Sequence, residues 1–180
     1  MNDWHERIQV VVAEVLPELS RLSAYHLYRD VIPSAHSRAT DRQIAMYEQY
    51  LGLRLPPSYR AFLELHNGYS WLAFPGHMLS IEEVMPNGDY FDDIKEWKTV
   101  MAEAGLGEAL DGIVVAYLDQ PNNWAYLDPN RPGADGEFDL ALHVPGVDPS
   151  YYATVVEFIA SSAERARLAL TWEAERLEKG

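Results

Sequence analysis

The sequence contains no cysteine among its 180 residues. This absence excludes disulfide bonds, zinc sites built on thiolates and cysteine nucleophiles. The chain also has no apolar run long enough to cross a bilayer, and its first residues lack the basic-then-apolar order of a secretory signal. We therefore expect a soluble protein of the cytoplasm that does not associate with membranes.

Basic residues are scarce, with 14 lysines and arginines against 28 aspartates and glutamates, for a net charge of −14. The imbalance is concentrated in residues 81–148, where 15 acidic residues accompany only Lys95, Lys98 and Arg131, a net charge of −12. Such a field repels the phosphates of nucleic acids and attracts a basic protein partner. An acidic surface that serves solubility alone is the other interpretation.

Catalytic and metal-binding motifs are also missing. The six histidines form no i, i+4 pair and no HExxH, and the chain has no GxSxG, P-loop or GxGxxG motif. His66 lies near a predicted helix end and has no partner residue for catalysis, so we expect it to cap the helix or pack there. Adjacent acids such as Asp92 and Asp93 arise by chance in so acidic a chain. The sequence predicts no enzyme, no metal and no cofactor.

Residues 128–139 partly match a calcium-binding loop. Asp128, Asn130, Gly133 and Asp139 fall at positions that such loops use. Pro132 stands where a ligand is expected, and the last position carries Asp in place of the bidentate Glu. A plain hairpin loop shaped by its proline and glycine is therefore favoured over a calcium site.

Apolar spacing predicts helices at both ends of the chain and short strands between them. Helices are expected over residues 3–16, continuing to Leu22 after a kink or restart at Pro17, and over 40–52, 80–84, 92–104 and from 151 onward. Strands are expected in a hairpin over 70–81 and over 113–118, 124–127 and 138–144, with a loop at 32–37. This order predicts an α+β fold with a central, mostly antiparallel sheet flanked by helices, an N-terminal helical extension and a long C-terminal helix.

Residues 55–68 specify a further short helix with sharp ends. Pro56 and Pro57 suit a first turn, where an N–H has no partner within the helix, and Ser58 is either the cap or a first-turn residue. One apolar face carries Tyr59, Phe62, Leu63 and His66 at helical spacing. The following Asn-Gly pair tolerates the left-handed conformation that ends a helix. The segment predicts architecture more than chemistry.

A longer motif passes through this helix and consists of Leu51, Gly52, Leu55, Pro56, Tyr59, Phe62, Leu63, Asn67 and Gly68. It resembles the SUKH superfamily, which includes fungal Smi/Knr cell-wall regulators and many bacterial toxin-immunity proteins. Tyr69 departs from the family pattern, which often has a second glycine there. The resemblance implies a mixed α+β fold and binding in place of catalysis. We expect one domain over 1–180, with a family-like core over 40–160 and an N-terminal helical extension over 1–38.

The resemblance and the charge together predict an immunity protein that binds and neutralises a cognate toxin, such as a basic nuclease. Exposed aromatic residues beside acids are the expected anchors, because Tyr and Trp dominate binding hot spots. The candidates are Tyr69, Trp71, Tyr90, Asp92, Asp93, Asp119, Asn122, Asn123 and Trp124. Trp97, by contrast, falls on the buried face of a predicted helix. The alternative function is a regulatory scaffold of cell-envelope or housekeeping assembly.

Overall fold

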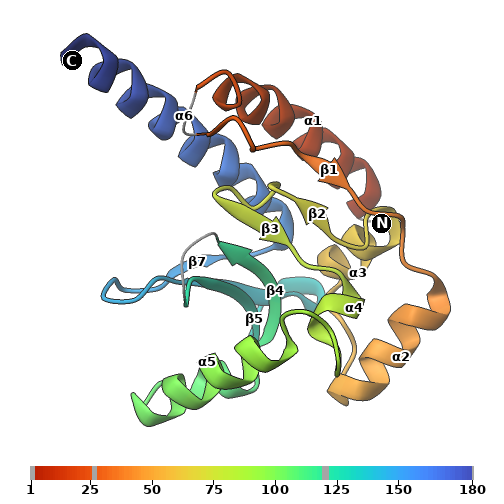
Figure 1. Cartoon of the computed structure of the whole chain (residues 1–180). Helices are drawn as coiled ribbons and strands as arrows, with labels where there is room; N and C mark the ends of the chain where they lie inside the picture. Colours follow the sequence, from red (N-terminus) through yellow and green to blue (C-terminus); the bar gives the residue numbers. More distant parts are fainter. Residues whose placement is uncertain (1–2, 26–27, 119–121, 180) are drawn as a thin grey trace.

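Figure 1 shows the computed structural model of the chain, which describes residues 3–25, 28–118 and 122–179. Within these residues, seven strands form one antiparallel sheet in which each strand pairs with its neighbours in sequence. The strands are β1 Ser34–Ala35, β2 Tyr69–Ser70, β3 Gly76–Met78, β4 Ile113–Leu118, β5 Trp124–Pro132, β6 Phe138–His143 and β7 Ser150–Tyr152. The predicted α+β class and antiparallel sheet are confirmed.

Helices lie on both sides of this sheet. They are α1 Trp4–Leu22, α2 Asp41–Leu51, α3 Pro57–Leu65, α4 Ile81–Val84, α5 Phe91–Glu103 and α6 Val155–Lys179, with the 3-10 turns η2 Gly107–Leu110 and η3 Ala134–Gly136. Helices α1, α3 and α6 pack together on one side, and α5 lies on the other (Figure 1). The hydrophobic core runs from Ile8 in α1 to Leu170 in α6. No helix in the described ranges is long and apolar enough to cross a membrane.

Local sequence signals define both ends of α2. Thr40 Oγ1 accepts a hydrogen bond from the Gln43 backbone N–H at 3.2 Å, and Gln43 Oε1 accepts one from the Thr40 N–H at 2.8 Å. Gly52 ends the helix in the left-handed conformation with a φ of 71°. These bonds satisfy N–H groups that have no partner within the helix. The predicted helix between Thr40 and Gly52 is confirmed.

The cap of α3 comes from a distant part of the chain. Pro56 precedes the helix and makes no side-chain cap. The carboxylate of Glu137, in the β5–β6 loop, instead accepts hydrogen bonds from the Ser58 backbone N–H at 2.7 Å and from Ser58 Oγ at 2.6 Å. Ser58 Oγ also accepts a bond from the Val155 N–H at the start of α6. One buried carboxylate thus connects the β5–β6 loop to α3 and, through Ser58, to α6.

The residues after α3 act differently from the prediction. His66 is an extended C-cap, and Gly68 has a φ of 94°. Asn67 is buried and does not have a positive φ; its Oδ1 accepts a bond from the Ile81 N–H at 2.9 Å, and its Nδ2 donates to the Glu82 carboxylate at 2.6 Å. Asn67 therefore holds the first turn of α4 in place, which the local sequence did not indicate.

Several element boundaries also differ from the prediction. In the predicted hairpin over 70–81, the strands are only Tyr69–Ser70 and Gly76–Met78, and β5 continues to Pro132, beyond its predicted end at Leu127. Helix α1 passes through Pro17 without a restart, because buried residues line the helix on both sides of the proline and the helix packs against α6 and α3. Residues 34–35 form strand β1 where a loop was predicted. Residues 150–152 form strand β7, so α6 begins at Val155 and not at Tyr151. Pairing with β2 and β6 supplies the hydrogen bonds of these two edge strands, and local periodicity does not reveal it.

Candidate functional site

A row of aromatic rings crosses the sheet on the side that α5 covers. His77 pairs with Tyr117, Tyr117 with Trp124 and Trp124 with His143, so the row runs over β3, β4, β5 and β6. Directly opposite residues of antiparallel strands point to the same face. The ring centroids of Tyr117 and Trp124 lie 5.0 Å apart. We call these four residues the aromatic row.

Helix α5 covers one end of the aromatic row and leaves the other end open. Trp97 lies against Trp124 and His143, with ring centroids 6.2 and 6.0 Å apart. Tyr90, just before α5, lies 5.4 Å from Tyr117. Trp97, Trp124 and His143 are buried, whereas Tyr90 and Tyr117 are partly exposed. The row therefore presents aromatic surface to solvent where α5 begins.

Carboxylates surround this open end. A hollow of about 240 Å³ is lined by Asp93, Glu96, Tyr117, Asn122 and Trp124. We call it the acidic notch. Asp93 and Glu96 share it because they lie three residues apart on α5. Burial raises the pKa of the neighbouring Tyr90 phenol, and nearby carboxylates, Glu83 foremost, raise it further. The notch combines negative potential with aromatic faces.

Acid should destabilise the protein through the buried ring of His143. Its Nε2 has no hydrogen-bond partner among the described residues, and burial lowers its pKa. Above the unfolded-state pKa of about 6.5 the ring is neutral in both states. As the pH falls below that value, the unfolded chain takes up the proton first, so the free energy of unfolding decreases until the folded pKa is reached.

His143→Phe is therefore expected to lose less free energy of unfolding than the wild type between about pH 7.5 and about pH 5. Every tenfold weakening of proton binding in the folded state contributes about 1.4 kcal/mol to this difference. Denaturant titrations across the pH range measure it. Burial also lowers the pKa of His66. Because His66 is present in both proteins, its contribution cancels when the two are compared. If the free energy of unfolding depends on pH in the same way for the two proteins, His143 has the same pKa in the folded and unfolded states, which would contradict the prediction.

A comparison with protein-family models matches residues 38–163 to the SMI1 / KNR4 family (SUKH-1). The match covers more than half of the chain. The chain belongs to this family. Its members are generally non-enzymatic immunity proteins, so membership supports a role of the toxin-immunity type with a protein partner. A comparison with curated protein sequences finds no match.

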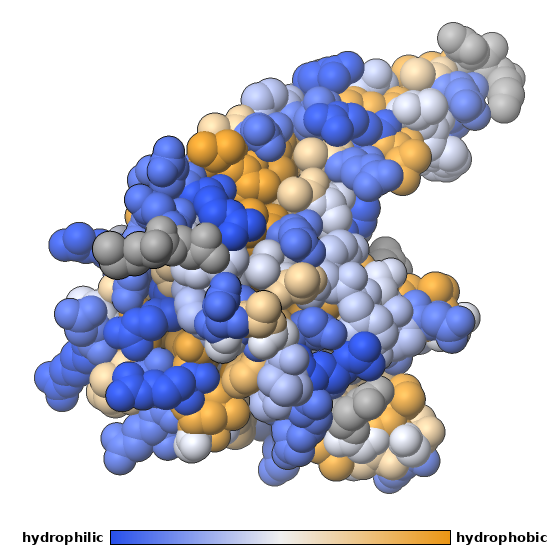
Figure 2. Space-filling model, turned by 180° about the vertical axis from the view of Figure 1, so that it is seen from behind, coloured by the Kyte–Doolittle hydropathy of each residue, from blue (hydrophilic) through white to orange (hydrophobic). Residues whose placement is uncertain are grey.

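The SUKH-1 match leaves out α1 and the C-terminal part of α6, and these two segments pack against each other (Figure 1). Arg167 of α6 donates to Glu18 of α1 at 3.0 Å. Seen from behind, hydrophobic patches along α6 alternate with hydrophilic side chains (Figure 2). Leu168 and Trp172 are among the exposed apolar residues there. The segments outside the match thus form a helical pair beside the SUKH-1 core.

Four of the residues predicted to bind a partner meet at the acidic notch. Asp93, Asn122 and Trp124 line it, and Tyr90 borders it, with its ring centroid 6.1 Å from that of Trp124. Asp92 is exposed at the adjacent position of α5. Trp124 is only 2% exposed, so it differs from the exposed anchor that the sequence predicts. It forms the floor of the notch because both α5 and Tyr117 pack against it.

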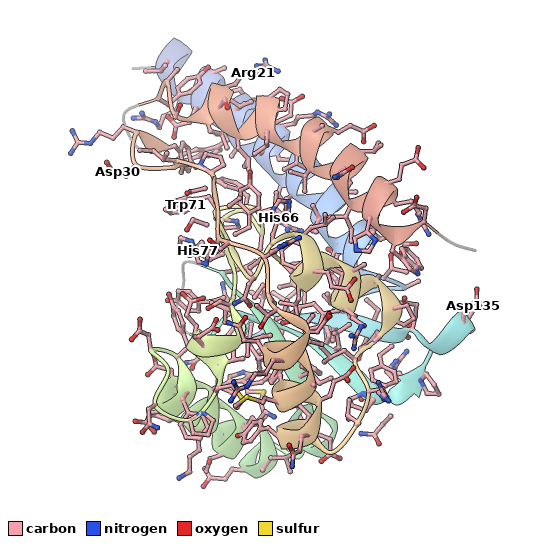
Figure 3. The ribbon with its side chains drawn as sticks, turned by 90° about the vertical axis from the view of Figure 1, so that its right-hand side faces the viewer. Arg21, Asp30, His66, Trp71, His77 and Asp135 are labelled. Carbon is pink, nitrogen blue, oxygen red and sulfur yellow. The ribbon has the colours of Figure 1, made fainter. Side chains whose placement is uncertain are left out.

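Trp71 and Tyr69 lie on opposite faces of the sheet. Trp71 packs on His77 with centroids 4.8 Å apart and donates its backbone N–H to His77 Nδ1, so it extends the open end of the aromatic row (Figure 3). Tyr69 pairs with Met78, whose side chain points away from that of His77. It is buried with its ring against His66, contrary to the predicted exposure.

The remaining predicted residues contribute less. Asn123 is half-buried, and its carbonyl accepts a bond from the Leu118 N–H. Asp119 lies outside the described residues. Glu96 and Tyr117 both line the notch but are not among the residues predicted from the sequence. Glu96 could have been predicted from its position one helical turn after Asp93. Tyr117 could not, because its place beside Trp124 depends on the pairing of β4 with β5.

Two carboxylates of the calcium-like loop make hydrogen bonds within residues 128–139. Asp128 is buried and accepts a bond from the Asn130 N–H at 2.9 Å, and Asp139 accepts one from Arg131 at 3.3 Å. The described residues hold no group of three or more histidines, aspartates or glutamates placed to bind a metal. Figure 3 shows Asp135 of this loop on the far side of the molecule from Trp71. Residues 128–132 belong to β5 and 138–139 to β6, so only residues 133–137 form the hairpin connection between these paired strands.

Proposed function

We propose that this chain is a non-enzymatic immunity protein that binds and neutralises a cognate bacterial toxin through the acidic notch. The observation that carries the proposal is the meeting of Asp93 and Glu96 with the rings of Tyr117 and Trp124, within a segment of net charge −12. A guanidinium or ammonium group is attracted both to carboxylates and to aromatic faces. Aromatic residues surrounded by polar side chains are typical of binding hot spots.

The partner that fits best is a basic protein of the cytoplasm, such as a nuclease. Nucleases present lysine and arginine side chains to the phosphates of their substrates. Carboxylates on α5 offer those side chains an alternative anionic partner. The acidic field of residues 81–148 also steers a basic protein toward this region before contact. Occupying a toxin's cleft in this way requires no catalytic group.

A regulatory scaffold of cell-envelope or housekeeping assembly is the second candidate. Leu168 and Trp172 on α6 are 65% and 55% exposed and lie one turn apart. Exposed apolar residues outside the family-matched core favour a permanent protein partner at α6. This function predicts binding that does not depend on the acidic notch.

Co-expression with the product of the neighbouring gene tests the first proposal. We expect that product to arrest growth, and this chain to restore growth and to co-purify with it. The notch variant, Asp92→Lys with Asp93→Lys and Glu96→Lys, should lose both effects. The control variant, Glu14→Lys with Asp30→Lys and Asp41→Lys, should retain them, because these exposed acids lie outside α5. The scaffold function would be favoured if the neighbouring gene product is harmless but binds this chain, and if the double variant Leu168→Ser with Trp172→Ser abolishes that binding.

A further inference from the structure

A second hollow lies between α2 and α5 and is separate from the acidic notch. It encloses about 340 Å³. Its walls are formed by residues of α2, α4, α5, η2 and the start of β4, among them Leu51, Val84, Ile94, Lys95, Lys98 and Thr99. We call it the α2–α5 cleft. Its volume falls in the range of pockets that hold small molecules, and its lining is mainly apolar, as in such pockets.

The polar groups of the α2–α5 cleft are cationic. Lys95 and Lys98 both line it, although residues 81–148 contain 15 acids and only one further basic residue. Neither lysine forms an ion pair within 4.0 Å of a carboxylate in the described part of the chain. Two unpaired cations at an apolar cleft are therefore an exception to the surrounding charge, and they are complementary to an anion.

Backbone contacts hold the ammonium group of Lys98 at the cleft wall. Its Nζ donates to the carbonyl oxygens of Leu110 at 2.8 Å and Gly112 at 2.7 Å. An ammonium group has one more N–H than these two bonds use. Burial lowers the pKa of Lys98, and the charge of Asp111 opposes this only in part. An anion bound beside Lys98 would compensate for the water that the ammonium has lost.

We propose that the α2–α5 cleft binds a small amphipathic carboxylate. The carboxylate group bonds to the free N–H of Lys98 and to the ammonium of Lys95, and the apolar tail lies among Leu51, Val84 and Ile94. This site is distinct from the acidic notch, because the two hollows share no lining residue.

Three probes with the same eight-carbon tail test the proposal: octanoate, octanol and octylammonium. Isothermal titration calorimetry on the full chain is expected to show saturable binding of octanoate, about tenfold tighter than that of octanol. In a protein of net charge −14, non-specific attraction favours octylammonium. A preference for the carboxylate can therefore come only from a local cationic site. Absence of saturable octanoate binding, or equal or tighter binding of octylammonium, would overturn the proposal.

Variants locate the site. Lys95→Met and Lys98→Met are each expected to weaken octanoate binding several-fold and to leave octanol binding nearly unchanged. Arg42→Met removes an exposed charge of α2 that does not line the cleft, and it should change neither. Lys98 also donates to two backbone carbonyl groups, so the Lys98→Met protein could fail to fold. In that case the test rests on Lys95→Met and on Thr99→Trp, whose larger side chain fills the cleft. Octanoate binding that survives both of these changes would place it elsewhere and refute the assignment.

Discussion

Reversing the charges on α5 is expected to slow association with a basic toxin by about tenfold to about a hundredfold at low salt. The notch variant, which changes Asp92, Asp93 and Glu96 to lysine, replaces attraction with repulsion where the partner approaches. Such charges act at long range, so the association rate constant falls more than the dissociation rate constant rises. Stopped-flow mixing at several salt concentrations measures this. The wild-type rate should fall steeply with added salt, and the variant rate should not.

The control variant, which changes Glu14, Asp30 and Asp41 to lysine, alters the net charge equally. Asp41 occupies the first turn of α2 as Asp92 and Asp93 occupy the first turn of α5. Both variants therefore lose stabilising contacts with a helix N-terminus, about 0.3–1 kcal/mol for each acid. Equal slowing in both would show that net charge alone matters. A notch variant with wild-type association rates and salt dependence would refute the proposed docking surface.

Glu137→Ala is expected to lower the free energy of unfolding by about 2–4 kcal/mol. The substitution removes the acceptor of two hydrogen bonds from Ser58, whose N–H and Oγ are buried at the start of α3. A buried donor without a partner costs its full desolvation energy. The loss should also loosen α6, because Ser58 contacts the Val155 N–H. Denaturant titration and hydrogen exchange at α3 and α6 measure both effects.

Glu137→Gln is the matched control for this prediction. Glutamine keeps an acceptor for the Ser58 N–H and has nearly the same shape. Burial raises the pKa of Glu137, with the hydrogen bonds from Ser58 opposing the shift, so the neutral side chain also avoids the cost of burying a charge. We expect Gln to retain most of the stability that Ala loses. Equal losses for the two variants would mean that Glu137 acts through packing and not through capping.

Elements whose ends depend on neighbouring residues could be predicted from the sequence. The bonds between Thr40 and Gln43 span three positions, and the left-handed Gly52 needs no distant partner. Strands β1 and β7 could not be predicted, since each is two or three residues long and exists only through pairing at a sheet edge. Of the kink or restart expected at Pro17, the restart does not occur, because tertiary packing outweighs a local preference.

The candidate site was predictable only in part. The sequence predicted which acidic and aromatic residues belong to this region and roughly where along the chain they lie. Which faces they occupy depends on strand register, since a shift of one residue moves a side chain to the opposite face. Register places Tyr117 beside Trp124 on the α5 side and sends Tyr69 to the other side. The partner-binding roles of these residues remain predictions that the charge-reversal experiment tests.

By itself the sequence determined the family, the types of the main elements and the sign of the charge. These properties follow from composition and from residues a few positions apart. Only the tertiary structure decided that Glu137 caps α3, that Asp93 meets the aromatic row and that Lys98 lines an apolar cleft. Each of these contacts joins side chains from different elements that come together only when the chain folds, so the spacing of residues along the chain does not predict them.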